Sequence, residues 1–176
     1  MKHCLIVYLI ALILCSCGYE KKEPSIKSDS NTTQSIDTIY AISDKIANRP
    51  LKTEINSKSP FLNTGFTKAV NEVENKYETG IKDSAVLYRN ETDTFFFYTT
   101  KDSDFLQYLN ISTKYEFLID ILQTGTSAAP LLKEVNIQKS PPNAYLIIRD
   151  EEEYSTISVE VRNNTIKRVI IDYIVE

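Results

Sequence analysis

The stretch TISVEVRNNTIKRVIIDYIV, residues 156–175, decides the fold. Apolar side chains recur at every second position on both sides of a pair of asparagines, which is the pattern of a β-hairpin. The turn could consist of Asn163 and Asn164 alone. That would place Val159 opposite Arg168, whereas a three-residue loop would place apolar residues opposite one another. We therefore predict a three-residue loop, with an asparagine in the left-handed conformation.

The second strand of this hairpin carries apolar residues on both faces. Val169 and Ile171 share one face. Ile166, Ile170 and Ile174 lie on the opposite face, because successive side chains of a strand alternate. We therefore expect this strand to be covered on both sides.

Other segments rich in Ile, Val, Tyr and Phe, separated by polar turn residues, extend the pattern along the chain. The segments predicted as strands are residues 86–88, 94–99, 131–137, 145–149, 156–161 and 166–175. Residues 36–42 and 105–111 fit a strand or a helix equally well. The C-terminal strands predict that an antiparallel sheet dominates the fold.

Two segments show the three- and four-residue spacing of an amphipathic helix instead. The first is residues 66–77, with Gly80 placed to end it. The second is residues 114–122, where Ser112 or Thr113 could cap the start. Together these patterns predict an α+β domain, in which an antiparallel meander sheet of C-terminal strands packs with one or two helices.

The N-terminus indicates export and lipid attachment. Its apolar run, residues 4–14, is shorter than the roughly 20 residues of a membrane-spanning helix but suits the core of a secretory signal. The sequence Leu-Cys-Ser-Cys at residues 14–17 resembles a lipobox, the lipoprotein signal-peptidase motif, whose last cysteine receives the lipid. The alternatives are a plain secretory signal or a buried apolar strand. Cys17 is the predicted lipidation site, because Cys15 would follow Leu14 where a small residue is needed.

The lipobox resemblance implies a Gram-negative lipoprotein of the cell envelope. Its acyl chains, palmitate among them, would hold it to a membrane, at the periplasmic face of the outer membrane or at the cell surface. We expect residues 1–16 to be the signal peptide and the polar residues 17–35 to be a lipidated, disordered tether. Residues 36–176 are then a single α+β domain.

Processing at Cys17 limits the catalytic and metal-binding side chains that the mature chain can use. It removes the only histidine, His3, and leaves the lipidated cysteine as the only one. Catalytic triads, Cys–His pairs and the usual zinc sites are thereby excluded, and we expect no catalytic residue, metal or cofactor. Processing also takes one of the 20 basic residues, Lys2, and none of the 24 acidic ones, so the formal charge moves from −4 to −5. This acidic balance gives no reason to expect a nucleic acid partner.

Two short segments are candidate sites. Phe95–Tyr98 places aromatic rings on both faces of one strand, which fits a stacking platform for sugars or a partner's side chains, or a buried central strand. The acids Asp150–Glu153 lack the ligand spacing of a calcium loop, which favours a solvated turn. Further carboxylates expected at solvated positions are Asp102, Asp104, Glu116 and Asp120.

The order of predicted elements from Ile111 to Val175 is a helical segment followed by antiparallel strands. This order resembles the small α+β modules of proteins similar to the β-lactamase inhibitor protein and to the outer-membrane assembly lipoproteins. The resemblance implies a meander sheet with a short helix packed on it. Those modules often open with a glycine, where this chain has Ser112 and Thr113, and the resemblance assigns no functional residue.

Two function classes fit the chain. The first is a non-catalytic envelope module that binds a protein partner, or a glycan, near the membrane. The second is a carboxylate-dependent hydrolase of envelope glycans, a chemistry that needs neither histidine nor cysteine. We favour the first, because the acids lie mainly in loops and on polar faces, where water keeps a carboxylate pair ionised.

Overall fold

The computed structural model describes residues 36–174. The predicted signal peptide, the lipidation site Cys17 and the predicted tether lie outside the described residues. The strands are β1 (Asp37–Ile42), β2 (Thr67–Glu74), β3 (Lys82–Arg89), β4 (Thr94–Thr99), β5 (Asp104–Ile111), β6 (Ala144–Arg149), β7 (Ser155–Arg162) and β8 (Thr165–Tyr173). The helical segments are α2 (Asp44–Ala47), η1 (Pro60–Asn63), η2 (Asp120–Leu122) and α3 (Ala129–Glu134).

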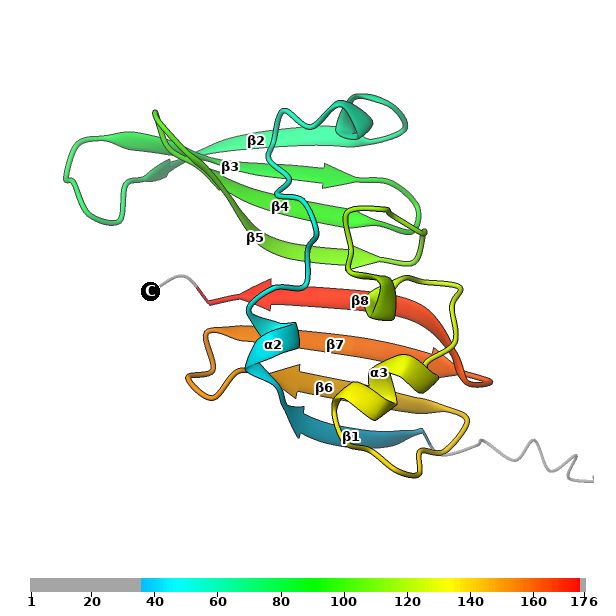
Figure 1. Ribbon diagram of the computed structural model, residues 1–176. Helices are drawn as coiled ribbons and strands as arrows, with labels where there is room; N and C mark the ends of the chain where they lie inside the picture. The colour runs from blue at the N-terminus through cyan, green and yellow to red at the C-terminus, as the bar shows by residue number, and fades with distance from the viewer. Residues whose placement is uncertain (1–35, 175–176) are drawn as a thin grey trace, which may run out of the picture. The chain divides into compact units, whose positions relative to one another are not determined.

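The strands form one eight-stranded sheet in the order β1-β6-β7-β8-β5-β4-β3-β2 (Figure 1). Neighbouring strands are antiparallel except β1 and β6, which are parallel. The predicted dominance of an antiparallel sheet is confirmed. The finer expectation of a pure meander packed with helices is wrong, since the sheet is mixed and the helical segments are short.

The connections cover one face of the sheet. Because β1 and β2 lie at opposite edges, residues 43–66 must cross the whole sheet between them, and α2 and η1 lie on this crossing segment (Figure 1). Residues 112–143, which include η2 and α3, cover the same face, where both connections bury apolar side chains in one core with the strands. One aromatic cluster of the core surrounds Phe95 of β4, which has no exposed surface and has four aromatic neighbours. Their ring centroids lie at 5.5 Å (Phe61), 5.6 Å (Phe66), 5.7 Å (Tyr115) and 6.1 Å (Phe117).

The hairpin of β7 and β8 combines a short turn with a β-bulge. Asn163 and Asn164 both take positive φ values, 51° and 58°, so the turn has two residues and the predicted three-residue loop is wrong. Val159 nevertheless lies opposite Val169, because the register shifts by one residue nearer the turn. The predicted pairing of apolar residues is therefore confirmed, but it results from a β-bulge and not from a three-residue loop.

The same bulge changes the face of one isoleucine. Ile166, expected on the side of Ile170 and Ile174, has no exposed surface and belongs to the core. Ile174 is 55% exposed. The expectation that β8 is covered on both faces is therefore wrong.

Both predicted helices are wrong, for different reasons. Residues 66–77 contain β2, an edge strand whose side chains are mostly exposed, so their helix-like spacing reflects no buried stripe. Residues 114–122 run mainly beside the crossing segment: the N–H of Ile119 donates to the carbonyl of Pro50, and the N–H of Lys52 donates to that of Phe117. Only η2 is helical there.

The predicted strand at residues 131–137 is wrong as well. It overlaps α3, whose first turn contains a proline, a residue favoured at helix starts, and whose Leu131 is fully buried. The remaining predicted strands are confirmed, and the two ambiguous segments are strands β1 and β5. Among residues 36–174, the helices are all too short to cross a bilayer.

Candidate functional site: the open face of the sheet

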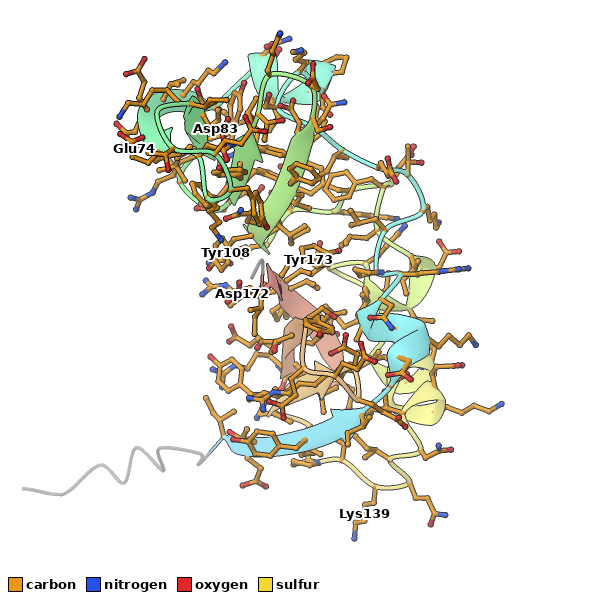
Figure 2. The ribbon with its side chains drawn as sticks, turned by 90° about the vertical axis from the view of Figure 1, so that its left-hand side faces the viewer. Glu74, Asp83, Tyr108, Lys139, Asp172 and Tyr173 are labelled. Carbon is orange, nitrogen blue, oxygen red and sulfur yellow. The ribbon has the colours of Figure 1, made fainter. Side chains whose placement is uncertain are left out.

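The sheet has a second face that residues 43–66 and 112–143 leave open. Because side chains alternate along a strand, Ile39 and Ala41 of β1 pack against the core, whereas Tyr40 and Ile42 point to the opposite side. Figure 2 shows the helical segments and the crossing segment on one side of the sheet, with side chains of the strands projecting from the other. We call this second side the open face.

Two rows of paired residues run across the open face through all the strands. The first row is Ala69, Leu87, Phe96, Tyr108, Asp172, Thr156, Arg149 and Ile42. The second is Thr67, Arg89, Thr94, Asn110, Ile170, Ser158, Ile147 and Tyr40. Both rows mix apolar and aromatic side chains with uncharged polar groups and a few charges.

The open face carries much of the exposed apolar surface. Among the described residues eight large apolar side chains are strongly exposed, and five of them lie on this face. They are Tyr40 (68% exposed), Ile42 (71%), Phe105 (49%), Tyr154 (48%) and Ile174 (55%). Phe105 belongs to the face because it pairs with Tyr98, and the N–H of Ile174 donates to the carbonyl of Tyr154, which continues the β7–β8 ladder.

Near the centre of the open face, Tyr108 of β5 lies opposite Asp172 of β8. Figure 2 shows both residues where these strands meet. The carboxylate of Asp172 is exposed, whereas the neighbouring Tyr173 points into the core, where burial raises the pKa of its phenol to about 12. The centre of the face therefore presents an aromatic ring beside a solvated negative charge.

At the β2–β3 end of the open face, the buried carboxylate of Asp83 links the β2–β3 turn to β4. Asp83 is 4% exposed and accepts hydrogen bonds from the hydroxyl of Tyr98 and from the amide of Asn75, the latter at 2.7 Å. The hydrogen bond to Asp83 also raises the pKa of Tyr98. These contacts hold the Tyr98 hydroxyl in place, and nothing in them suggests catalysis.

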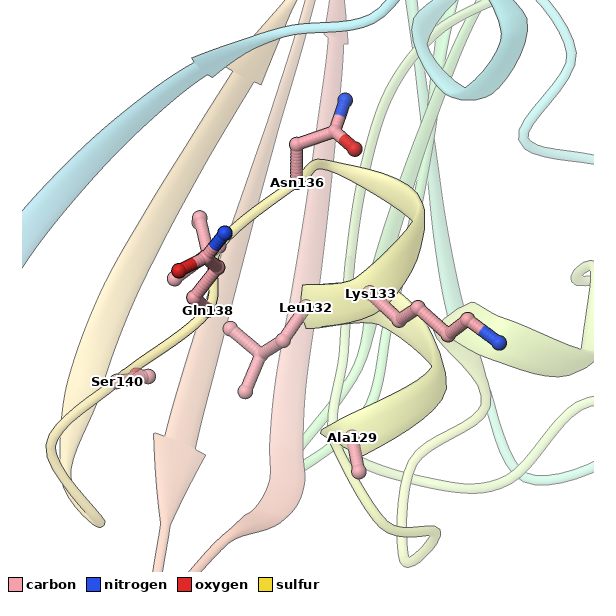
Figure 3. Close-up of a pocket in the computed structure, with 7 residues that line it drawn as sticks. Ala129, Leu132, Lys133, Asn136, Gln138 and Ser140 are labelled. Carbon is pink, nitrogen blue, oxygen red and sulfur yellow. The ribbon is translucent and has the colours of Figure 1, made fainter.

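Two of the hollows among the described residues differ in which face of the sheet they adjoin. One, of about 570 Å³, lies on the open face between β2 and β3 and is lined in part by Thr67, Ala69, Leu87 and Arg89. The other, of about 450 Å³, lies beside α3 and away from the open face (Figure 3). Its lining residues are Ala129, Leu132, Lys133, Asn136, Ile137, Gln138 and Ser140. Both are shallow and lack a cluster of reactive groups.

The aromatic candidate segment is divided between the two faces. Phe95 and Phe97 are fully buried in the core, Phe96 is half-buried on the open face, and Tyr98 is 8% exposed. This segment is thus mainly a central strand whose core face is buried. Phe96 contributes to the open face through its place in the first row.

The candidate carboxylates do not converge on one site. Asp150 is buried and accepts a hydrogen bond from the N–H of Ser155 at 3.3 Å, whereas residues 151–153 are exposed in the β6–β7 turn, as predicted. Asp104 accepts from the hydroxyl of Ser57 at 2.6 Å, and Asp102 is exposed. Glu116 is exposed on no helix, and Asp120 pairs with Lys52 at 2.5 Å.

One buried carboxylate with three hydrogen-bond donors was not singled out from the sequence. Asp93, 1% exposed, accepts from the N–H groups of Ser112 (2.8 Å) and Thr113 (3.2 Å) and from the hydroxyl of Tyr115 (2.8 Å). Burial by itself raises the pKa of Asp93, but these hydrogen bonds outweigh burial, so that the pKa lies below its ordinary value. Burial and the bond to Asp93 raise the pKa of Tyr115. In the sequence, Asp93 is distinguished only by its position in a polar turn directly before β4.

Within residues 36–174 there is no group of three or more His, Cys, Asp or Glu side chains that could hold a metal ion. The open face is therefore the most distinctive surface of the described chain. No family model, curated protein or solved structure matches this chain.

Proposed function

We propose that this protein is a non-catalytic lipoprotein of the cell envelope that binds a protein partner through the open face. The observation that carries the proposal is the concentration of exposed Tyr, Ile and Phe side chains on the sheet face that residues 43–66 and 112–143 leave open. Monomeric proteins rarely expose large apolar patches unless something binds there.

The composition of the face suits a protein partner. Tyr40 and Tyr154 offer large amphipathic rings, which are enriched where proteins bind one another. Ile42 and Ile174 add apolar surface. Threonine, serine and arginine side chains between them can form hydrogen bonds with the partner.

The carboxylates favour binding over hydrolysis. A glycosidase needs one carboxylic acid whose pKa is raised, so that it can donate a proton. The pKa values of Asp93 and Asp104 are both lowered: burial opposes this change, but hydrogen bonds from Ser112 to Asp93 and from Ser57 to Asp104 outweigh it. Both groups therefore serve as hydrogen-bond acceptors.

The lipid anchor at Cys17 and an envelope location remain part of the proposal, as does the resemblance to the α+β inhibitor-like modules, and all rest on sequence alone. The tether would join the domain just before β1, the edge strand that carries Tyr40 and Ile42. A partner on the open face would therefore be held close to the point where the tether enters.

Photo-crosslinking in intact cells tests the binding face. A benzoylphenylalanine replaces Tyr40 or Tyr154 in the full chain, and the matched control replaces Tyr77, which is 75% exposed in the β2–β3 turn. We expect one protein, the same from both open-face positions, to be crosslinked and to be absent from the control. Ile42→Asp should reduce the yield at Tyr154.

Equal yields from Tyr77 and from the open face would contradict the proposal. So would turnover of peptidoglycan or another envelope polysaccharide that is lost when one Asp or Glu becomes Asn or Gln. A glycan bound to the face without turnover would replace the protein partner with a sugar.

A further inference from the structure

Strand β2 ends the sheet with an unpaired edge. β3 pairs with one side of it, and the N–H of Asn75 donates to the carbonyl of Ile81 at 2.9 Å. Since hydrogen-bonded pairs alternate along an antiparallel ladder, Lys68, Val70 and Glu72 direct their backbone groups away from β3. Among residues 36–174, no other strand pairs with this outer side. The edge can therefore accept a further strand.

The side chains of the same three residues form a symmetric pattern. Lys68, Val70 and Glu72 share the face opposite the open face, since Val70 pairs with the core residue Val86. All three are exposed, and Val70 is 53% exposed. A positive charge lies two residues before this valine and a negative charge two residues after it. Reversing the strand direction therefore places opposite charges against each other.

We propose that β2 pairs antiparallel with β2 of a second copy of this chain, about a two-fold axis at Val70. In this register Lys68 lies opposite the partner's Glu72, and Val70 lies opposite the partner's Val70. The outward backbone groups of both strands then bond to one another. Two ion pairs flank one apolar contact, and each such cross-strand pair is stabilising.

Neighbouring registers are less favourable. An axis at Glu72 places like charges directly opposite each other, which is destabilising. An axis at Asn71 places Val70 opposite the partner's Glu72 and leaves the valine without an apolar contact. The register at Val70 combines the two ion pairs, the apolar contact between the valines and the backbone hydrogen bonds.

The two-fold axis is perpendicular to the sheet, so the sheet continues through both copies and the open faces lie on the same side. Residues of β2 that face the open side, such as Ala69, are not part of the ion pairs. The dimer is thus independent of the proposed binding function. Unlike β2, the edge strand β1 has no such pair of opposite charges about its centre.

Charge exchange tests the interface. The full chain is solubilised in a density-matched detergent, and its dimer dissociation constant is measured by sedimentation equilibrium. We expect Lys68→Glu and Glu72→Lys each to weaken the dimer by about tenfold or more, because each variant creates two like-charge pairs. The double variant, with both changes, restores opposite charges and should dimerise as the wild type does.

Lys139→Glu, an equal charge change in an exposed loop away from β2, is the matched control and should leave dimerisation unchanged. Circular dichroism verifies that every variant is folded. A wild-type chain that stays monomeric at high concentration overturns the proposal. So does a dimer that Lys68→Glu leaves intact, or a double variant that does not recover.

Discussion

Tyr108 lies opposite Asp172 at one end of the ladder between β5 and β8. The other pairs of this ladder are Leu109 with Ile171, Asn110 with Ile170, and Ile111 with Val169. This short ladder is the only strand pairing between the β2–β5 hairpins and the strands β1, β6, β7 and β8. The strand pairing at this junction therefore involves few residues. Four of their side chains, Leu109, Ile111, Val169 and Ile171, lie in the core directly behind the open face.

The first prediction concerns this ladder. Leu109 and Ile171 are paired and fully buried, so Leu109→Ala or Ile171→Ala leaves a cavity and should lower the free energy of unfolding by about 2–5 kcal/mol. The two effects should not add in the double variant, because the residues are in contact. Urea denaturation gives the values. Ile42→Ala, at a strongly exposed position, should change stability by under about 0.5 kcal/mol.

A second prediction follows from the lowered pKa of Asp93. A carboxyl whose pKa is lower when folded stabilises the protein above its unfolded pKa of about 3.9, and this stabilisation is lost as the pH falls through the folded value. Stability should therefore fall with acid below about pH 5, and part of the fall should disappear in Asp93→Asn. Denaturation series at several pH values measure both slopes; equal slopes would contradict the role given to Asp93.

The phenol of Tyr115 provides a third, separate prediction. Tyr115→Phe keeps the ring among its aromatic neighbours but removes the hydroxyl that donates to Asp93. Asp93 retains two backbone donors, so the expected loss is about 0.5–1.5 kcal/mol, as for one hydrogen bond. Tyr115→Ala should cost clearly more, because the stacked contact with Phe117 is lost as well.

The asparagine turn makes a fourth prediction. Asn164 has a φ of 58°, which disfavours any side chain that is branched at Cβ. Asn164→Gly should keep or raise stability, whereas Asn164→Val should lower it by about 1–2 kcal/mol. Thermal unfolding compares the two; a valine variant as stable as the glycine variant would show that the turn has another conformation.

The fifth prediction tests the anchor. Cys17→Ala should abolish metabolic labelling with a fatty acid and leave an unprocessed precursor, while Cys15→Ala should be labelled as the wild type is. Labelling of both variants would show that the lipobox assignment is wrong. Protease treatment of intact cells then separates the cell surface from the periplasmic face.

The strands with strict alternation were predictable, and the segments that depend on long-range contacts were not. β7 and most of β8 follow from period-two patterns, and β4 and β6 follow from short runs of aromatic and aliphatic residues between polar turns. The bulge in β8 was not predictable, because either a longer loop or an extra residue in one strand satisfies the same apolar pairing. Residues 114–122 carry a helical spacing, but their backbone groups bond to the crossing segment, which no local pattern reveals.

The open face was only partly predictable. Aromatic residues on both faces of β4 were evident, and the sequence allowed a stacking surface there. Which face is covered depends on the paths of residues 43–66 and 112–143. The first path joins β1 and β2 at opposite edges, and the second joins β5 to β6 across β7 and β8. Such a strand order leaves no signal in the alternation of any single strand.

The parallel pairing of β1 with β6 also constrains the order of folding. The N–H of Glu151 donates to the carboxylate of Asp44, 107 residues earlier. Contacts between residues so far apart in the sequence form slowly. During synthesis β1 emerges first, yet its place exists only after β6 has formed, whereas the hairpins from β2 to β5 can assemble from local contacts. The N-terminal strand is then the last to dock. A protein that binds β1 before it docks would delay only the closing step of folding.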